Sequence, residues 1–341
     1  MSEVNLQETL SSIRDSVEPV IRQILTDGVE SKNTELILYQ NGTGGKRIRP
    51  ALVVLCGQLF GGNLDDLLFP AASIEVLHKS TLILDDIIDR SEFRGGKLTA
   101  WEKYGTSFAQ CTTFTYLASV FGGLANVKNG SRLADLYSKT LKIIVDGEIK
   151  DILFERSGRE DEGYAADNRY EFISKDDYFE MVGQKTASLL KACCQAGAIS
   201  SGADNMQIQT IGDFGYNLGV AFQIRDDLLD IFGNEKDFGK QIGKDIIEKK
   251  MGNFVILSAL EKLGSEKKAV IIDSLEGSNE ITEDQVAKIT NLIIQTNAKS
   301  DAEEAEDSYI QKALKSLEKL PQNENTESLR QLALYVVARN K

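Results

Sequence analysis

Two short acidic clusters in this chain repeat the pattern Asp-Asp-x-x-Asp. Their members are Asp85, Asp86 and Asp89 in the first cluster and Asp226, Asp227 and Asp230 in the second. On a helix, the first and fifth residues of such a cluster lie about one turn apart and share a face. Carboxylates gathered this closely repel one another unless a cation lies between them, and oxygen donors without histidine favour a hard ion such as magnesium. We therefore predict that the two clusters bind magnesium.

A single acidic cluster is most often a solvated helix face. Both clusters, however, are flanked by apolar residues: Leu82, Ile83, Leu84, Ile87 and Ile88 around the first, and Phe222, Ile224, Leu228, Leu229 and Ile231 around the second. Carboxylates embedded in otherwise buried helices need a reason to be there. The repetition of the pattern in two distant parts of the chain favours a functional interpretation.

Basic residues occur where a metal-bound diphosphate would need them. They are Lys46, Arg47 and Arg49 in the segment GGKRIRP, Arg94 after the first cluster, Lys185, and Lys240 and Lys244 after the second cluster. Lys185 alone would be interpreted as a surface residue. Together with the aspartates, these cations predict two diphosphate sites, one bridged by metal and one bound directly by Lys and Arg.

The composition of the chain excludes several classes of protein and of binding site. The chain has 341 residues, of which 42% are hydrophobic and 27% charged, and its net charge of −13 leaves little attraction for nucleic acid. Its four cysteines form no CxxC pair and it has one histidine, so we predict no zinc site, reduced thiols and a cytoplasmic location. We expect neither a signal peptide nor a membrane span of roughly 20 apolar residues.

The hydrophobic pattern and the scarcity of proline favour an all-α fold. We predict helices within 5–41, 50–60, 65–93, 106–154, 175–200 and 205–232, a surface loop at 157–171, a glycine-rich turn at 233–245, and further helices to 341. No Ser/Gly-rich or Pro-rich linker divides the chain. We therefore expect one domain, residues 1–341.

The motifs GGKRIRP, LDDIID, GQKTASL, FQIRDDLLD and GKQIGKD appear in an order and at separations that resemble the trans-isoprenyl diphosphate synthases, or polyprenyl synthetases. The resemblance covers about residues 40 to 255 and is closest to geranylgeranyl or longer-chain synthases. It implies a bundle of long, mostly antiparallel helices around a central cavity, usually in a homodimer. It also implies three magnesium ions per active site and two substrates, isopentenyl diphosphate and an allylic diphosphate.

The resemblance also implies roles for individual residues. Asp85, Asp89, Asp226 and Asp230 would bind magnesium, with Asp86 and Asp245 in support. Arg94, Lys185 and Lys240 would hold the allylic diphosphate, whereas Lys46, Arg49 and His78 would hold isopentenyl diphosphate. Thr186 would also bind substrate. Gln223 and Asp151 match polar positions at the reacting end, and Lys250 retains a basic position. The predicted catalytic set is Asp85, Asp86, Asp89, Arg94, Lys185, Gln223, Asp226 and Lys240.

One residue departs from the family pattern, and two others bear on the length of the product. The family usually reads DDxxDxxxxRRG, so Gly95 replaces an arginine that commonly contacts isopentenyl diphosphate. Ser80 and Thr81 lie about one helical turn before the first cluster, where bulky aromatic residues close the pocket for short products in this family. Their small size predicts a linear product of C20 or longer, with C25 to C30 as the central expectation, unless Phe114, Tyr116 or Phe121 forms a floor.

The predicted reaction is a head-to-tail, E-configured condensation of isopentenyl diphosphate with an allylic diphosphate, releasing diphosphate. A terpene cyclase is one alternative, which the paired motifs and GGKRIRP disfavour because a cyclase needs no isopentenyl diphosphate site. A non-catalytic or regulatory subunit of a heteromeric prenyl synthase is another. The retention of all six aspartates disfavours that alternative, whereas Gly95 favours it slightly.

Overall fold

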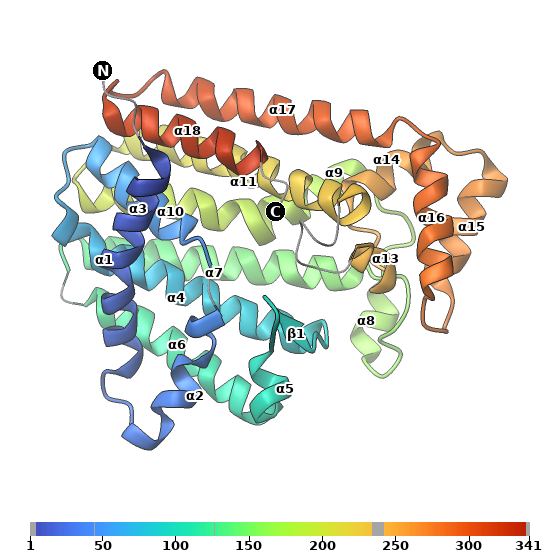
Figure 1. The fold of residues 1–341 in the computed structure, drawn as a ribbon, viewed down its shortest axis with the longest axis horizontal. Coiled ribbons are helices and arrows are strands. Elements are labelled where there is room, and N and C mark those ends of the chain that lie inside the picture. Colours follow the sequence, from blue (N-terminus) through green and yellow to red (C-terminus); the bar gives the residue numbers. More distant parts are fainter. Residues whose placement is uncertain (1–4, 44, 126, 234–241, 339–341) are drawn as a thin grey trace. The chain divides into compact units, whose positions relative to one another are not determined.

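The computed structural model describes residues 5–43, 45–125, 127–233 and 242–338, and most of them are helical (Figure 1). The described residues group into two compact units. Unit 1 takes its residues from 1–140, 189–215 and 313–334, and unit 2 takes its residues from 141–188, 216–312 and 335–341. The prediction of an all-α fold is confirmed.

Unit 1 is formed mainly by the N-terminal part of the chain. Its helices are α1 (Leu6–Thr26), α2 (Thr34–Tyr39), α3 (Ile48–Leu59), α4 (Leu64–Ile88), α5 (Ala100–Tyr104) and α6 (Thr106–Leu124). Two strands, β1 (Phe93–Arg94) and β2 (Lys97–Leu98), follow α4. Helix α7 (Gly130–Leu153) begins in unit 1 and ends in unit 2.

Unit 2 is formed mainly by the C-terminal part. It contains α8 (Gly163–Asn168), α9 (Lys175–Val182), α13 (Lys244–Ile247), α14 (Phe254–Lys262), α15 (Ser265–Glu276) and α16 (Glu283–Ile294). Helices α10 (Ser188–Ser200), α11 (Asn205–Phe232), α17 (Ala298–Leu317) and α18 (Glu324–Ala338) contribute residues to both units. A π-helical segment, Gly183–Ala187, joins α9 to α10.

Helix α4 carries the first acidic cluster and is the core helix of unit 1. Asn63 caps it by accepting a hydrogen bond from the Asp66 backbone N–H, and Asp65 and Asp66 complement the positive end of the helix dipole. In Figure 1, α4 runs beside α6, against which it packs most extensively within the unit. Among the described residues, α4 is the one helix apolar and long enough to span a membrane, but 67% of its most apolar stretch is buried in the protein.

A β-hairpin not predicted from the sequence follows α4. Phe93 pairs with Leu98 and Arg94 pairs with Lys97, so Gly95 and Gly96 are the two residues of the turn. Their φ angles are +57° and +76°, as a type I′ hairpin turn requires. The helix predicted to continue to residue 93 therefore ends at Ile88, and the hairpin directs Arg94 back towards the end of α4.

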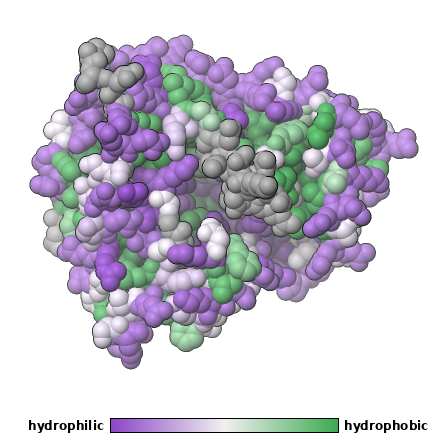
Figure 2. Space-filling view, viewed as in Figure 1, coloured by the Kyte–Doolittle hydropathy of each residue, from purple (hydrophilic) through white to green (hydrophobic). Residues whose placement is uncertain are grey.

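Other boundaries also differ from the prediction. The stretch 106–154 is two helices, α6 and α7, which are separated around Asn129, a residue with a positive φ angle. The predicted loop 157–171 contains the short helix α8. Most of the predicted turn at 233–245, including Lys240, lies outside the described residues. The face seen in Figure 2 is predominantly hydrophilic, in keeping with the high charged content.

Candidate active site

The three aspartates of the first cluster occupy different environments at the C-terminal end of α4. Asp85 and Asp89 are partly exposed, and the Asp89 backbone N–H donates to the Asp85 carbonyl at 2.8 Å. Asp86 is buried, with 1% of its surface exposed, and accepts a 2.7 Å hydrogen bond from Arg94 Nε. Asp85 and Asp89 are thus accessible to an ion, while Asp86 anchors Arg94.

The glycine-rich segment GGKRIRP leads into α3 and positions three cations differently. The guanidinium of Arg47 is buried and forms ion pairs with Glu18 of α1 and with Glu75 of α4, the latter at 2.9 Å. Arg47 therefore holds this segment against two helices. Lys46, in contrast, is exposed and Arg49 is partly exposed, as their predicted role in substrate binding requires.

His78 lies on α4 among basic side chains. Burial, followed by the charges of Arg49, Lys79, Arg94 and Arg47, holds the pKa of His78 well below its usual value of 6.5. The imidazole is therefore neutral at pH 7. It is suited to donate one hydrogen bond to a diphosphate rather than to bind it as a cation.

Ser80 and Thr81 both bond back to the helix. Ser80 is buried and its Oγ donates to the Leu77 carbonyl at 2.7 Å, while the partly buried Thr81 donates to the His78 carbonyl at 2.9 Å. Of the aromatic residues considered as a floor for the product, Phe114 is 74% exposed and does not line the core of unit 1. Tyr116 is fully buried and donates to the Ile37 carbonyl at 2.6 Å.

The second acidic cluster lies on α11, within unit 2. Asp226 is partly exposed, whereas Asp227 is only 2% exposed. Asp227 accepts hydrogen bonds from Tyr178 Oη (2.8 Å), Gln223 Nε2 (3.0 Å) and the Phe254 backbone N–H (2.8 Å). Tyr178 and Phe254 tie α11 to α9 and α14, whereas Gln223 lies on α11 itself. Asp227 therefore fixes the helix, while its neighbour Asp226 is partly exposed.

Lys185 and Thr186 lie in the π-helical segment, a geometry that often occurs at functional sites. Lys185 Nζ contacts Asp151 Oδ2 and Glu148 Oε2 of α7, each at 2.7 Å. Thr186 Oγ1 donates to Gln223 Oε1 at 3.0 Å and so connects this segment to the second cluster. The segment approaches α7 closely, because a Cβ at Gly147 would lie 2.4 Å from the Lys185 backbone nitrogen.

Two carboxylates lie close together at the second cluster, one from Asp230 of the cluster itself and one from Asp245. Asp230 accepts hydrogen bonds from the backbone N–H groups of Lys244 (2.9 Å) and Asp245 (3.3 Å), and Asp245 accepts one from Asn253 Nδ2 (2.8 Å). Burial and the neighbouring Asp245 carboxylate raise the pKa of Asp230 well above its usual value. Lys250 Nζ lies 3.8 Å from Asp151 Oδ2.

The carboxylates of the two acidic clusters are suitable donors for magnesium. Among the described residues, no three His, Cys, Asp or Glu side chains converge closely enough to hold a metal by themselves. The accessible donors of each motif, Asp85, Asp89 and Asp226, are all carboxylates, the donor type magnesium prefers. The raised pKa of Asp230 also indicates an excess of buried negative charge that a cation would relieve. The donor set therefore fits a hard cation that completes its shell with water and substrate oxygens.

The structure adds residues that the sequence interpretation did not single out. In unit 2 they are Tyr178, Glu148 and Asn253, and in unit 1 they are Glu75 and Lys79. Glu75 and Lys79 lie four residues apart on α4 and therefore on one face, a spacing visible in the sequence. The unit 2 partners come from separate helices, so no local pattern indicates them.

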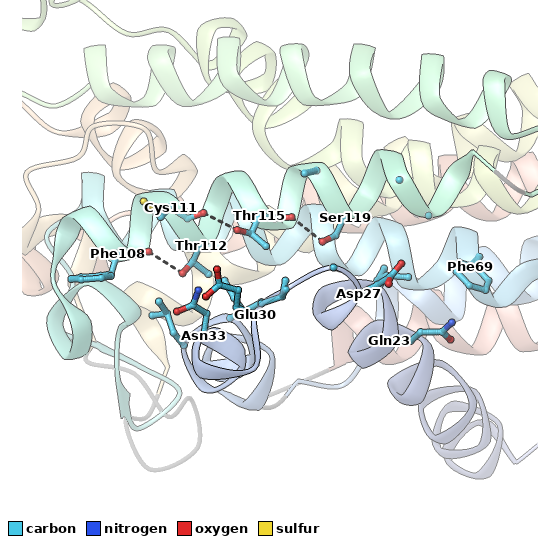
Figure 3. A pocket seen from close by; sticks show the side chains of 18 of the residues that line it. Gln23, Asp27, Glu30, Asn33, Phe69, Phe108, Cys111, Thr112, Thr115 and Ser119 are labelled. Atoms are coloured by element: carbon cyan, nitrogen blue, oxygen red, sulfur yellow. Dashed lines mark hydrogen bonds between the residues drawn. The ribbon is translucent and has the colours of Figure 1, made fainter.

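A pocket of about 940 Å³ in unit 1 contains none of the predicted site residues (Figure 3). It is formed by the C-terminal end of α1, the segment after it, α2 and one face of α6, including Phe108, Cys111 and Thr115. In Figure 3, Thr112, Thr115 and Ser119 of α6 bond back to their own helix. The acidic clusters, rather than this pocket, identify the candidate active site.

Known proteins resemble this chain in sequence and in fold. The model of the polyprenyl synthetase family matches residues 31–293. The chain is 29% identical to the geranylgeranyl diphosphate synthase of Sulfolobus acidocaldarius over 97% of this chain and 98% of that protein. It is 32% identical to component 2 of the heptaprenyl diphosphate synthase of Geobacillus stearothermophilus over 90% and 89% of the two chains. A crystal structure of a polyprenyl synthase from Caulobacter crescentus, complexed with calcium and isoprenyl diphosphate, has a TM-score of 0.86 at 27% identity and covers 98% of each chain.

Proposed function

Because the chain belongs to the polyprenyl synthetase family and has its all-α isoprenoid-synthase fold, we propose that it is a magnesium-dependent trans-prenyltransferase. It would condense isopentenyl diphosphate with an allylic diphosphate, head to tail, into a linear E-configured polyprenyl diphosphate. The observation that carries this proposal is the repeated Asp-Asp-x-x-Asp pattern. In both copies the first aspartate is accessible and the second is held in place by hydrogen bonds.

The proposed roles follow the exposure and contacts of each residue. Asp85, Asp89, Asp226 and Asp230 would bind magnesium, with three ions per active site as the family resemblance implies, and Asp86 and Asp245 would support them. Arg94, Lys185, Thr186, Gln223, Lys240 and Lys250 would act on the allylic substrate. Lys46, Arg49 and His78 would bind isopentenyl diphosphate.

The chemistry begins with loss of diphosphate from the allylic substrate. Magnesium, when bound, would neutralise the charge that builds up on the leaving group. Lys185, oriented by Asp151 and Glu148, and Arg94, oriented by Asp86, would hold the leaving diphosphate while the C–O bond breaks. The alkene of isopentenyl diphosphate then forms the new C–C bond with the allylic cation.

The condensation ends with loss of a proton from the new cation. Burial, together with the surrounding basic side chains, lowers the pKa of His78, and its proposed role is to bind isopentenyl diphosphate. The departed diphosphate, which carries negative charge beside the new bond, would therefore accept the proton. The products are one longer allylic diphosphate and one diphosphate, which carries the proton.

We propose a product of C20 or longer, centred on C25 to C30. Ser80 and Thr81 are small and lie one turn before Asp85, and the named relatives make geranylgeranyl and heptaprenyl chains, which bracket this range. If the growing chain passes these residues, Ser80→Phe would shorten the product. Ser80→Ala, which keeps a small side chain, is the matched control.

We further propose a single-domain cytoplasmic homodimer. Helix α6 exposes Phe108 (58%) and Phe114 (74%), an apolar surface that a second copy would cover. The heptaprenyl relative is named component 2, which favours a heteromeric synthase as the second candidate. Light scattering of the purified chain separates a homodimer from a monomer that needs a partner.

The test is to incubate the purified chain with magnesium, labelled isopentenyl diphosphate and one allylic primer at a time, from dimethylallyl to geranylgeranyl diphosphate. Dephosphorylated products are then sized. Linear products that disappear on chelation of magnesium are expected. Cyclic products would favour a terpene cyclase, whereas no elongation with any primer would favour a non-catalytic or regulatory subunit.

A further inference from the structure

Position 95, where the family resemblance leads us to expect an arginine, lies in the turn of the β1–β2 hairpin. Gly95 occupies the first position of a type I′ turn at φ +57°, where an L-residue with a side chain is strained. The nearby Lys97 does not take the place of that arginine, because its ammonium donates to the Gly42 carbonyl at 2.9 Å.

Lys79 is a lysine buried beside the segment that carries Lys46 and Arg49. It follows His78 on α4 and is only 6% exposed. Its Nζ lies 4.0 Å from the point that a Cβ of Gly45 would occupy, and Arg47 Nη1 lies 3.1 Å from the same point. The ammonium thus lies against the start of the segment predicted to bind isopentenyl diphosphate.

The charges around Lys79 are predominantly positive. Glu75, one turn earlier on α4, favours its ammonium form, but the same carboxylate also binds Arg47 at 2.9 Å. Arg47, Arg94 and Arg49 all oppose it, and burial together with these charges lowers the pKa of Lys79 to about 8. Arg47 is paired with Glu18 and Glu75, and Arg94 with Asp86, but the charges of all three guanidinium groups still oppose the buried Lys79 ammonium. This arrangement suits a multiply charged ligand such as a diphosphate.

We propose that Lys79 binds the diphosphate of isopentenyl diphosphate and supplies the positive charge that Gly95 does not. This inference rests on the proposed prenyltransferase function. It adds a binding residue on α4, next to His78, to the set predicted from the motifs. Because its ammonium lies beside Gly45, at the start of the segment that carries Lys46 and Arg49, Lys79 is assigned to the isopentenyl substrate.

Steady-state kinetics of Lys79→Met and Lys79→Arg test this proposal. Loss of a charge-assisted contact predicts a rise of about ten- to a hundredfold in the KM for isopentenyl diphosphate. The KM for the allylic primer should change less than about twofold, and Lys79→Arg should keep most of the affinity. Lys139→Met, which removes a lysine whose side chain is 69% exposed, is the matched control and should behave as the unsubstituted protein.

The unsubstituted protein provides a second test that needs no variant. As the pH rises through about 8, Lys79 loses its proton in the free protein. The KM for isopentenyl diphosphate should therefore increase, while that for the allylic primer, measured in parallel, should not follow. Burial sets this titration, together with the charges of Glu75 on α4, Arg47 and Arg49 at the start of α3, and Arg94 on the hairpin.

The outcomes separate this inference from the proposed function. If the unsubstituted protein elongates a primer but Lys79→Met leaves the isopentenyl KM unchanged, or raises both KM values equally, the role of Lys79 is overturned. If no primer is elongated, the proposed function fails. In that case the affinity for isopentenyl diphosphate is measured by calorimetry for the unsubstituted protein and for Lys79→Met. Equal affinities, or no binding to either protein, would overturn the role of Lys79.

Discussion

Asp226 and Asp227 are adjacent in one motif, yet their surroundings differ. Asp227→Ala would leave Tyr178 Oη and the Phe254 N–H without their buried acceptor. We expect a loss of about 2 to 4 kcal/mol in the free energy of unfolding. Asp226→Ala removes a partly exposed carboxylate and should cost less than about 0.5 kcal/mol. Urea denaturation of both variants measures this difference.

The two substitutions should affect activity in the opposite order to that in which they affect stability. Asp226→Ala is expected to lower kcat by about a hundredfold or more, because it removes a carboxylate that we propose binds magnesium, while the fold persists. At a temperature where both variants are folded, Asp227→Ala should retain more activity than Asp226→Ala. Equal stability of the two variants would contradict a structural role for Asp227.

The lowered pKa of Lys79 predicts an effect on the stability of the fold as well as on substrate binding. Its pKa of about 8 lies below the ordinary value of 10.5, so the unfolded chain binds more protons than the folded chain between these pH values. Stability due to this group therefore rises as the pH increases from about 8 to about 10.5. At pH 7 the buried charge is a cost, and Lys79→Met should raise the free energy of unfolding by about 1 to 3 kcal/mol.

Chemical denaturation without substrate at pH 7 and pH 10 tests the sign. The stability gap between Lys79→Met and the unsubstituted protein should narrow at pH 10. The exposed control Lys139→Met should show little gap at either pH. A Lys79→Met variant that is less stable at pH 7 would show that the lysine is retained for folding, not for binding.

At the scale of single elements, the β1–β2 hairpin determines where Arg94 points. Gly95→Ala places a Cβ at φ +57° and should cost about 1 kcal/mol in the free energy of unfolding. Gly163→Ala is the matched control, since Gly163 begins α8 with open space around it, where alanine should be neutral or stabilising. Thermal denaturation of the two variants is the measurement. Equal effects would indicate that the turn adapts.

The elements also show what the sequence predicts well. Apolar periodicity predicted the helix that carries Asp85, because α4 is buried along most of its length. The end of that helix is predicted wrongly, because the glycine pair forms a two-residue hairpin turn rather than a helix stop. The break between α6 and α7 was also missed, because the helical apolar pattern continues across it. Local patterns thus indicate helices better than their ends.

Sequence patterns likewise predict some residues of the candidate site and not others. The aspartates could be predicted because each motif is contiguous and its spacing matches one helical turn. The support for Asp227 could not, because Tyr178 and Phe254 come from other helices and only folding brings them together. Lys79 went unnoticed because a single lysine on an apolar helix carries no signal until its burial is known. Long-range contacts are the part that sequence spacing does not contain.

At the scale of the whole molecule, the two compact units are not separated by linkers. Helices α7, α11, α17 and α18 each contribute residues to both units. Helix formation is cooperative along a continuous segment, so melting one unit would remove turns that sustain helices of the other. We therefore expect one unfolding transition, in agreement with the single domain proposed from the sequence.

Differential scanning calorimetry tests this expectation, with the protein concentration varied because assembly alters the apparent midpoint. A calorimetric enthalpy equal to the van't Hoff enthalpy per cooperative unit is expected. Two resolved transitions would show that the units fold independently. In that case Asp227→Ala should lower only the transition of unit 2, because all of its hydrogen-bond partners lie there. With a single transition, the same variant should lower the midpoint of the entire protein.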